Sequence, residues 1–305
     1  MEPFRFPYKV PPAAEQRAEN RRMLECISRY MHFADADTLT PSAVAELAEA
    51  CGVPREYAYA ELLAAALGLD TIDADRDFFR AYFLPAVKEY RTGDFLMDPY
   101  RAYFPKEEVR AGNYRYRTQR LLPCELFVAG DLQRLPDGRI IPRLGFFAEE
   151  YAYPAALAGD REWMTLLPVE CITVRPVAEE AFGRVLTYGL GLGYFTLLAA
   201  ENPRVERVTA VELDGDAVRL FESQILPRLP KDVRGKITLT VGDALDYADG
   251  VSAENTDFVF ADIWHDAADG RAPYLALRER ERANVCYRYW IEETLLCYLD
   301  GSLNA

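Results

Sequence analysis

Three glycines at alternate positions, Gly189, Gly191 and Gly193, separate two apolar runs in the stretch VLTYGLGLGYF. Glycine tolerates positive φ angles and lets a ligand touch the main chain. A glycine-rich turn from a parallel strand into a helix places free backbone N–H groups at the carboxyl edge of the sheet, where nucleotides bind. The third glycine of the dinucleotide fingerprint would fall on Tyr194, which disfavours nicotinamide and flavin cofactors. The alternative for the turn alone is that its glycines serve only tight packing between strand and helix.

An acidic residue follows each of the next three expected strands. Glu212 lies at the end of the strand in VTAVELD, Asp243 follows KITLTVG, and Asp262 follows TDFVFA. Because the carboxyl ends of parallel strands meet at one edge of a sheet, we expect these carboxylates to face a single crevice. A carboxylate at the position of Glu212 can accept both hydroxyls of a ribose, and Asp243 can accept from an adenine amino group.

Residues 185–266 resemble the nucleotide-binding core of class I S-adenosylmethionine-dependent methyltransferases, because these four motifs occur in the family's order. The resemblance implies S-adenosylmethionine as cofactor, with its methionine moiety over the glycine turn, its ribose on Glu212 and its adenine on Asp243. It also implies that Asp262 faces the methyl group and the acceptor. The residues expected at the cofactor are Tyr188, Gly189, Leu190, Gly191, Gly193, Glu212, Leu213, Asp243, Ala244, Asp262 and Glu170.

Two departures from the family pattern affect this interpretation. Members commonly carry an acid two residues before the first glycine, where this chain has Thr187; Glu170 is our candidate substitute, with a surface role as the alternative. The residues after Asp262 read as helices rather than as further strands, so we expect the sheet to be truncated or completed by another segment. Both departures resemble spermidine synthases, which share the core, although their Asp-Ser-Ser-Asp pattern has no close copy in the stretch DIWHD.

Methyl transfer is an in-line displacement at a sulfonium carbon, so the protein has to align the acceptor and take its proton where necessary. Asp262 and His265 are the candidate catalytic residues, and a solvated loop histidine is the alternative for His265. Three classes of function remain open. They are a methyltransferase with an unidentified acceptor, for which we expect a small molecule, an aminopropyltransferase, and a non-catalytic module that binds the nucleotide or a protein partner.

The elements that must position these residues alternate between strand and helix from the strand RVLTYG, residues 184–189, onward. This alternation predicts an α/β fold with a Rossmann-like, doubly wound, mostly parallel sheet. Before it we expect a β-rich connecting region over 121–175, with hairpin turns at Pro-Asp-Gly and Gly-Asp. A helical domain is expected over 1–120, and the cofactor-binding domain over 176–305. In the helical domain, Thr40 is the predicted N-cap of a helix that stops near Gly52, and a second helix runs from Pro54 to Leu67.

This helix pair resembles the helix-turn-helix of bacterial regulators, but residues 35–70 carry seven acids and one base. That balance, and the net charge of −14, argue against nucleic acid as a partner and permit a cationic acceptor. Six scattered cysteines and two histidines argue against a metal site and suit a reducing cytoplasm. No apolar stretch is long enough to cross a membrane, and the N-terminus has no signal-peptide pattern. The oligomeric state is left open.

Overall fold

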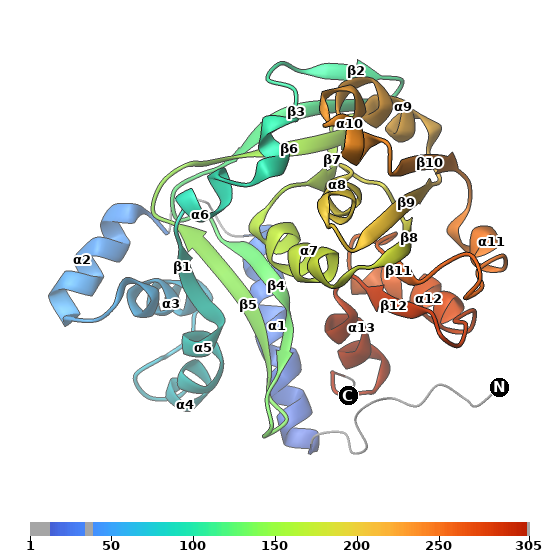
Figure 1. Ribbon diagram of the computed structural model, residues 1–305. Helices are drawn as coiled ribbons and strands as arrows, with labels where there is room; N and C mark the ends of the chain where they lie inside the picture. Colours follow the sequence, from blue (N-terminus) through green and yellow to red (C-terminus); the bar gives the residue numbers. More distant parts are fainter. Residues whose placement is uncertain (1–12, 34–38, 304–305) are drawn as a thin grey trace. The chain divides into compact units, whose positions relative to one another are not determined.

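The computed structural model describes residues 13–33 and 39–303 (Figure 1). The N-terminal stretch used in the signal-peptide prediction therefore lies largely outside the described residues. The described chain forms two compact units, each built from segments that are distant in the sequence. The first unit comprises residues 96–119 and 152–295, and the second comprises 13–33, 39–95, 120–151 and 296–303. The three consecutive domains expected from the sequence do not coincide with these units, and the expected boundary at residue 176 falls inside helix α7.

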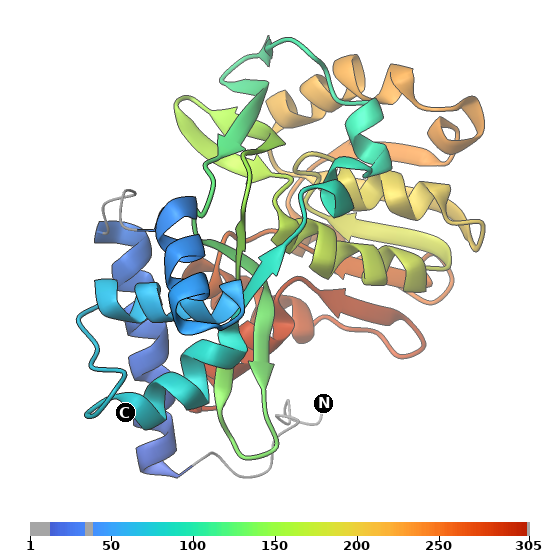
Figure 2. The ribbon, with the colours of Figure 1, turned by 90° about the vertical axis from the view of Figure 1, so that its left-hand side faces the viewer.

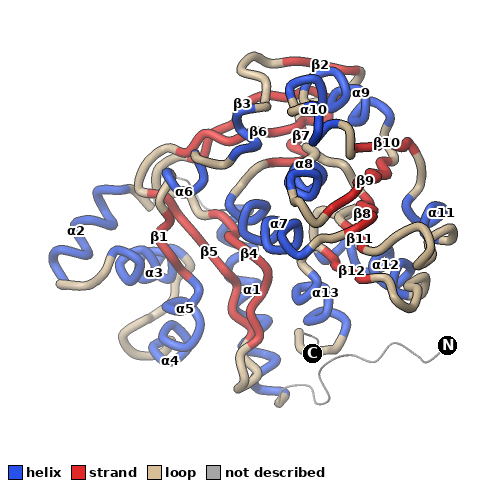
Figure 3. Tube along the Cα trace, viewed as in Figure 1, coloured by secondary structure: helices blue, strands red, loops and turns tan. Residues whose placement is uncertain are grey.

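A five-stranded parallel sheet with the order β10-β9-β8-β11-β12 forms the centre of the first unit (Figure 3). Its strands are β8 (Gly183–Tyr188), β9 (Val205–Glu212), β10 (Ile237–Val241), β11 (Phe258–Ala261) and β12 (Cys286–Tyr289). All four residues of β11 are buried, as expected for a strand covered on both faces. The apolar residues Ile237, Leu239 and Val241 alternate along β10, which predicts that they share a buried face. Val241 is nevertheless 57% exposed, and β10 is an edge strand of the sheet.

Helices connect successive strands of this sheet, which confirms the predicted doubly wound α/β fold. The helical segments are α7 (Pro168–Glu180), α8 (Tyr194–Glu201), α9 (Gly215–Gln224), η3 (Leu226–Arg228), α10 (Lys231–Arg234), α11 (Ala244–Ala248), α12 (Ala267–Arg278) and α13 (Glu292–Leu299). Helices α7 and α8 lie side by side over one face of the sheet (Figure 1 and Figure 2), and α11 and α12 lie over the other (Figure 1).

The prediction that only helices follow Asp262 is wrong in one respect, because β12 pairs in parallel with β11. The C-terminal segment itself therefore supplies a fifth strand. Its sequence, CYRY, is only four residues long and lies between two charged helical stretches, so no periodicity marks it.

A smaller antiparallel sheet with the order β2-β3-β6-β7 precedes the parallel sheet in the chain. Its strands are β2 (Val109–Ala111), β3 (Tyr114–Leu121), β6 (Tyr151–Ala158) and β7 (Arg161–Thr165), and two short helical segments, α6 (Gly93–Leu96) and η2 (Pro99–Ala102), come before it. The predicted Gly-Asp hairpin turn joins β6 and β7, and Gly159 adopts the left-handed region there, with φ +61°.

The second unit combines helices with the three-stranded sheet β1-β5-β4. Its elements are α1 (Ala14–Phe33), α2 (Pro41–Cys51), α3 (Arg55–Ala66), α4 (Arg76–Phe78), the π-helical segment η1 (Phe79–Phe83), α5 (Leu84–Ala86), β1 (Val87–Tyr90), β4 (Phe127–Arg134) and β5 (Ile140–Phe147). The predicted limits of α2 are confirmed: the Thr40 hydroxyl accepts from the Ala43 N–H at 3.2 Å, and Gly52 ends the helix with φ +63°. The ring of Tyr59 stacks on that of Phe146 in the core, with centroids 3.9 Å apart.

Two expectations for this unit are wrong. Residues 87–90 were expected to continue a helix, but they form β1, which pairs in parallel with β5. The helical spacing of Met23, Leu24, Ile27 and Met31 predicts that they share one apolar face of α1. Met23 and Ile27 are buried and Leu24 is partly buried, but Met31 is half exposed. None of the helices in the described residues is both long enough and apolar enough to span a bilayer.

Candidate functional site

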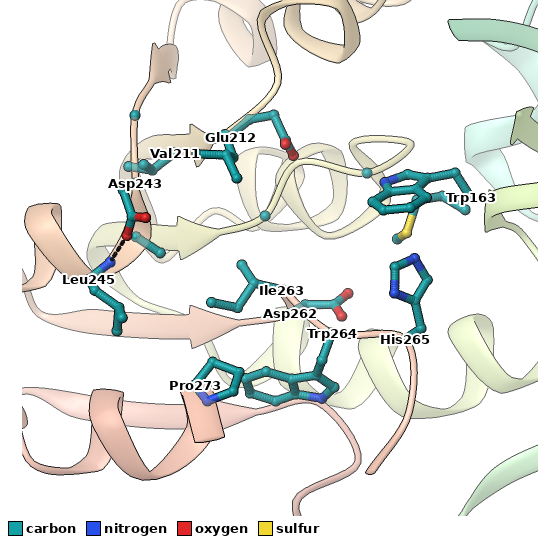
Figure 4. A pocket seen from close by; sticks show the side chains of 16 residues that line it. Trp163, Val211, Glu212, Asp243, Leu245, Asp262, Ile263, Trp264, His265 and Pro273 are labelled. Carbon is teal, nitrogen blue, oxygen red and sulfur yellow. Dashed lines mark hydrogen bonds between the residues drawn. The ribbon is translucent and has the colours of Figure 1, made fainter. Parts of the chain in front are cut away.

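A cavity of about 290 Å³ lies at the carboxyl ends of the parallel strands, entirely within the first unit (Figure 4). It lies near the point where the strand order reverses, between β8 and β11, which is the usual ligand position in doubly wound sheets. The lining residues come from the glycine turn, from the loops after β9, β10 and β11, and from β7. They are Trp163, Met164, Gly189, Gly191, Val211, Glu212, Leu213, Gly242, Asp243, Ala244, Leu245, Asp262, Ile263, Trp264, His265 and Pro273.

Eight of the residues expected from the sequence line this cavity: Gly189, Gly191, Glu212, Leu213, Asp243, Ala244, Asp262 and His265. Four others do not. The side chains of Tyr188 and Leu190 are buried. Gly193 is the N-cap residue of α8. Glu170 lies in the first turn of α7.

All three glycines of the turn have positive φ, but protein groups account for much of the missing side-chain volume. A Cβ atom at Gly189 would lie 2.0 Å from the backbone oxygen of Asp262. At Gly193 it would lie 2.0 Å from the Phe221 ring. The missing side chains thus make room for packing within the protein, and Gly189 and Gly191 also line the cavity.

Glu212 ties the glycine turn to the end of β9. Its Oε2 accepts from the Leu190 N–H at 2.9 Å and its Oε1 accepts from the Asp214 N–H at 3.0 Å. A carboxylate has about four acceptor positions, so these two bonds leave capacity on each oxygen for a ligand donor. Figure 4 shows the carboxylate directed into the cavity.

Asp243 stands at the start of α11 as its N-cap, where Oδ1 accepts from the Leu245 N–H at 2.7 Å. The apolar side chains of Leu213 and Ile263 also line the cavity and are 72% and 36% exposed. Exposed apolar side chains beside a carboxylate suit a flat ligand with one polar edge.

Three carboxyl groups, those of Glu212 and Asp262 in the cavity lining and that of Glu170 on α7, influence one another electrostatically. Burial, and then the charge of Glu212, raise the pKa of Asp262 to about 7. Burial, and then the charge of Asp262, raise the pKa of Glu170 well above its usual range. Such a cluster favours a cationic ligand, because opposite charge offsets the cost of holding carboxylates in a buried site.

His265 and Asp269 form a hydrogen-bonded pair on the loop after β11. The ring Nδ1 lies 3.0 Å from Asp269 Oδ2, and the backbone N–H groups of His265 and Asp266 both donate to the Asp269 carboxylate. The His265 Nε2 is shielded from solvent and has no hydrogen-bond partner among the described residues. The Trp163 ring meets the imidazole edge to face, with centroids 4.3 Å apart.

Three residues at or beside the cavity were not expected there from the sequence: Asp269, Trp163 and Met164. The spacing of Asp266 and Asp269 forms the capping box of α12 and could have pointed to Asp269. Nothing in the local sequence of β7 shows that Trp163 and Met164 face the cavity. Trp264 is buried, donates to the Trp290 carbonyl oxygen at 3.2 Å and also lines the cavity.

No protein-family model matches the chain, and no curated protein matches it. Similar solved structures include the glycopeptide N-methyltransferase MtfA complexed with sinefungin, at 26% identity over 38% of this chain and 47% of that chain, with a TM-score of 0.28. Precorrin-6y C5,15-methyltransferase from Geobacter metallireducens is 18% identical over 40% of this chain and 60% of that chain, with a TM-score of 0.29. A probable spermidine synthase from Corynebacterium glutamicum is 12% identical over 52% of each chain, with a TM-score of 0.32.

The match therefore spans about half of the MtfA chain. Methyltransferases and spermidine synthases are the two classes that the sequence resembles. The fold assignment itself rests on the parallel pairing and order of the five strands.

Proposed function

We propose that the chain is an S-adenosylmethionine-dependent methyltransferase that acts on a small-molecule acceptor. The observation that carries the proposal is the meeting of Glu212, Asp243 and Asp262 with the glycine turn around one cavity. These residues come from the ends of three different strands, so their convergence is a property of the fold.

The residues present fit the cofactor group by group. Glu212 has free acceptor capacity for the two ribose hydroxyls, and Asp243 can accept from the adenine amino group between the apolar side chains of Leu213 and Ile263. The cofactor's sulfonium and ammonium groups are cationic, which suits the carboxyl cluster of Asp262 and Glu170.

When bound, S-adenosylmethionine supplies a methyl group on positively charged sulfur, which is already activated for displacement. The chain then has to align the acceptor and remove its proton. Asp262 suits that task, because a pKa of about 7 balances the ionised fraction against basicity at neutral pH. His265 offers a second proton acceptor on the same loop.

One observation favours aminopropyl transfer as a second candidate. Among the described residues that line the cavity there is neither lysine nor arginine. The carboxylate of S-adenosylmethionine would therefore depend on backbone N–H groups, whereas decarboxylated S-adenosylmethionine has no carboxylate to satisfy. That cofactor donates an aminopropyl group to an amine.

A thermal-shift panel with S-adenosylmethionine, S-adenosylhomocysteine, decarboxylated S-adenosylmethionine and NAD separates these functions. We expect the first two ligands to raise the melting temperature, because a ligand at 100 times its dissociation constant stabilises by about 2.7 kcal/mol. A shift with the decarboxylated compound alone would support aminopropyl transfer. A shift with NAD alone would contradict both candidates.

A further inference from the structure

A buried hydrogen-bond cluster lies in the first unit, outside the cavity lining, and centres on Asp98 just before η2. The Asp98 residue is 3% exposed. Its Oδ1 accepts from the Tyr100 N–H at 2.8 Å, and its Oδ2 accepts from the Tyr194 hydroxyl at 2.6 Å and from Arg175 Nη2 at 2.5 Å. A buried carboxylate is tolerated only when paired and hydrogen-bonded, so these partners fix the segment firmly.

The cluster contacts the glycine turn at two adjoining points. The fully buried Tyr100 donates its hydroxyl to the Leu192 carbonyl oxygen at 2.5 Å. Leu192 stands between Gly191 and Gly193. Tyr194, whose hydroxyl meets Asp98, is the first residue of α8, and its ring packs edge to face on Tyr100 with centroids 5.7 Å apart.

We propose that Asp98 and Tyr100 are positioning residues that hold the glycine turn in its ligand-binding conformation. The proposal rests on the proposed function, because it assigns the turn to the cofactor. Glu212 also holds the turn, through the Leu190 N–H. The turn is thus held at two points, by residues from two other segments of the chain.

The contacts with Asp98 and Tyr100 raise the fraction of molecules in which the glycine turn has its ligand-binding conformation. A turn with three positive-φ glycines at alternate positions has many conformations available when its carbonyl groups are unpaired. If only a fraction of molecules holds the competent shape, the apparent dissociation constant rises by the inverse of that fraction. Tyr100 does not line the cavity, so it acts on binding and not on the chemical step.

The test compares Tyr100→Phe with a matched control, Tyr116→Phe. Tyr116 is also a buried tyrosine of the first unit, but its hydroxyl has no hydrogen-bond partner among the described residues. Calorimetric titration with S-adenosylhomocysteine should show affinity about tenfold weaker in Tyr100→Phe, because a buried carbonyl loses its donor. Tyr116→Phe should bind like the wild type, and turnover of Tyr100→Phe at saturating S-adenosylmethionine should stay within about twofold of the wild type.

Amide hydrogen exchange over residues 189–194 provides a readout that needs no ligand. Exchange there should be faster in Tyr100→Phe and unchanged in Tyr116→Phe. If Tyr100→Phe does not fold, Tyr194→Phe serves instead, because it keeps the Arg175–Asp98 ion pair.

Wild-type affinity and exchange in the Tyr100→Phe variant would overturn the positioning role while leaving the methyltransferase proposal intact. Absence of binding of either adenosyl compound by the wild-type protein would instead overturn the proposed function and, with it, the cofactor role of the turn.

Discussion

The glycine turn and the loop after β11 line one cavity but contribute different groups to it. The turn is fixed through its backbone, by Glu212 at the Leu190 N–H and by Tyr100 at the Leu192 carbonyl. The loop after β11 instead offers titratable side chains, Asp262 and His265, to the cavity. Under the proposed function, the turn is a rigid rim that holds the cofactor, and the loop is a reactive rim that moves protons.

The largest effect should follow from changing the reactive rim. Asp262→Asn removes the proposed proton acceptor and should lower turnover by about 10²–10⁴-fold while S-adenosylhomocysteine binding changes far less. In the wild type, turnover should rise as pH increases through about 7, because Asp262 must be ionised to accept a proton. Steady-state rates over pH 5–9 check both points, and unchanged turnover in Asp262→Asn would remove Asp262 from the mechanism.

The Asp262→Asn variant also tests how stability depends on pH. Turnover should rise with pH, whereas the contribution of Asp262 to the free energy of unfolding should fall. Because the folded-state pKa of Asp262 is raised, the folded protein binds the proton more tightly than the unfolded chain between the ordinary aspartate range and about pH 7. The contribution of this group to stability therefore falls as pH rises through that window. Urea unfolding at pH 5 and pH 8 should show a smaller loss in Asp262→Asn than in the wild type.

A weaker effect is expected at the rigid rim. Glu212→Gln replaces one carboxylate oxygen by an NH₂ group, which cannot accept a hydrogen bond from a backbone N–H or from a ribose hydroxyl. S-adenosylhomocysteine should therefore bind about 10- to 100-fold less tightly. Glu222→Gln is the matched control, since Glu222 is exposed on α9 and away from the cavity lining. Equal affinities in the two variants would remove the ribose assignment.

Within the glycine turn, packing and conformational strain can be separated. Gly193 and Gly68 share a φ of +76°, but an added Cβ meets Phe221 at Gly193 and nothing within 4 Å at Gly68. Gly193→Ala should lose about 1–3 kcal/mol more of the free energy of unfolding than Gly68→Ala, which is the usual cost of overpacking. Denaturant titrations followed by circular dichroism measure the difference, and equal losses would show that Phe221 adapts freely.

The smallest effect is expected for the His265–Asp269 pair. His265→Asn keeps a donor for Asp269 but lacks Nε2, and should lower turnover about tenfold, the value of one hydrogen bond in the transition state. Asp269→Asn can donate to Nδ1 and so moves the imidazole proton to Nε2, with a similar loss.

The double variant should lose no more than either single variant, because both changes remove the same function. Asp266→Asn is the control, since asparagine preserves the N-cap of α12. Additive losses in turnover would contradict a shared role for the pair.

The sequence predicts features that depend on neighbouring residues. Thr40 and Gly52 carry the signals that begin and end α2, and the carboxylates after β9, β10 and β11 follow from strand–helix alternation. Contacts between segments that are distant in the sequence cannot be predicted from such local patterns. The carboxyl group of Asp98 reaches α8 from nearly a hundred positions away along the chain. Trp163 on β7 contacts His265 on the loop after β11, about a hundred positions later in the chain.

The most direct measurement is a crystal structure of the protein with S-adenosylhomocysteine. Both ribose hydroxyls should lie within hydrogen-bonding distance of the Glu212 carboxylate, with the adenine beside Asp243 and the sulfur facing Asp262. A nucleoside located anywhere else, or a ribose with no contact to Glu212, would contradict the account.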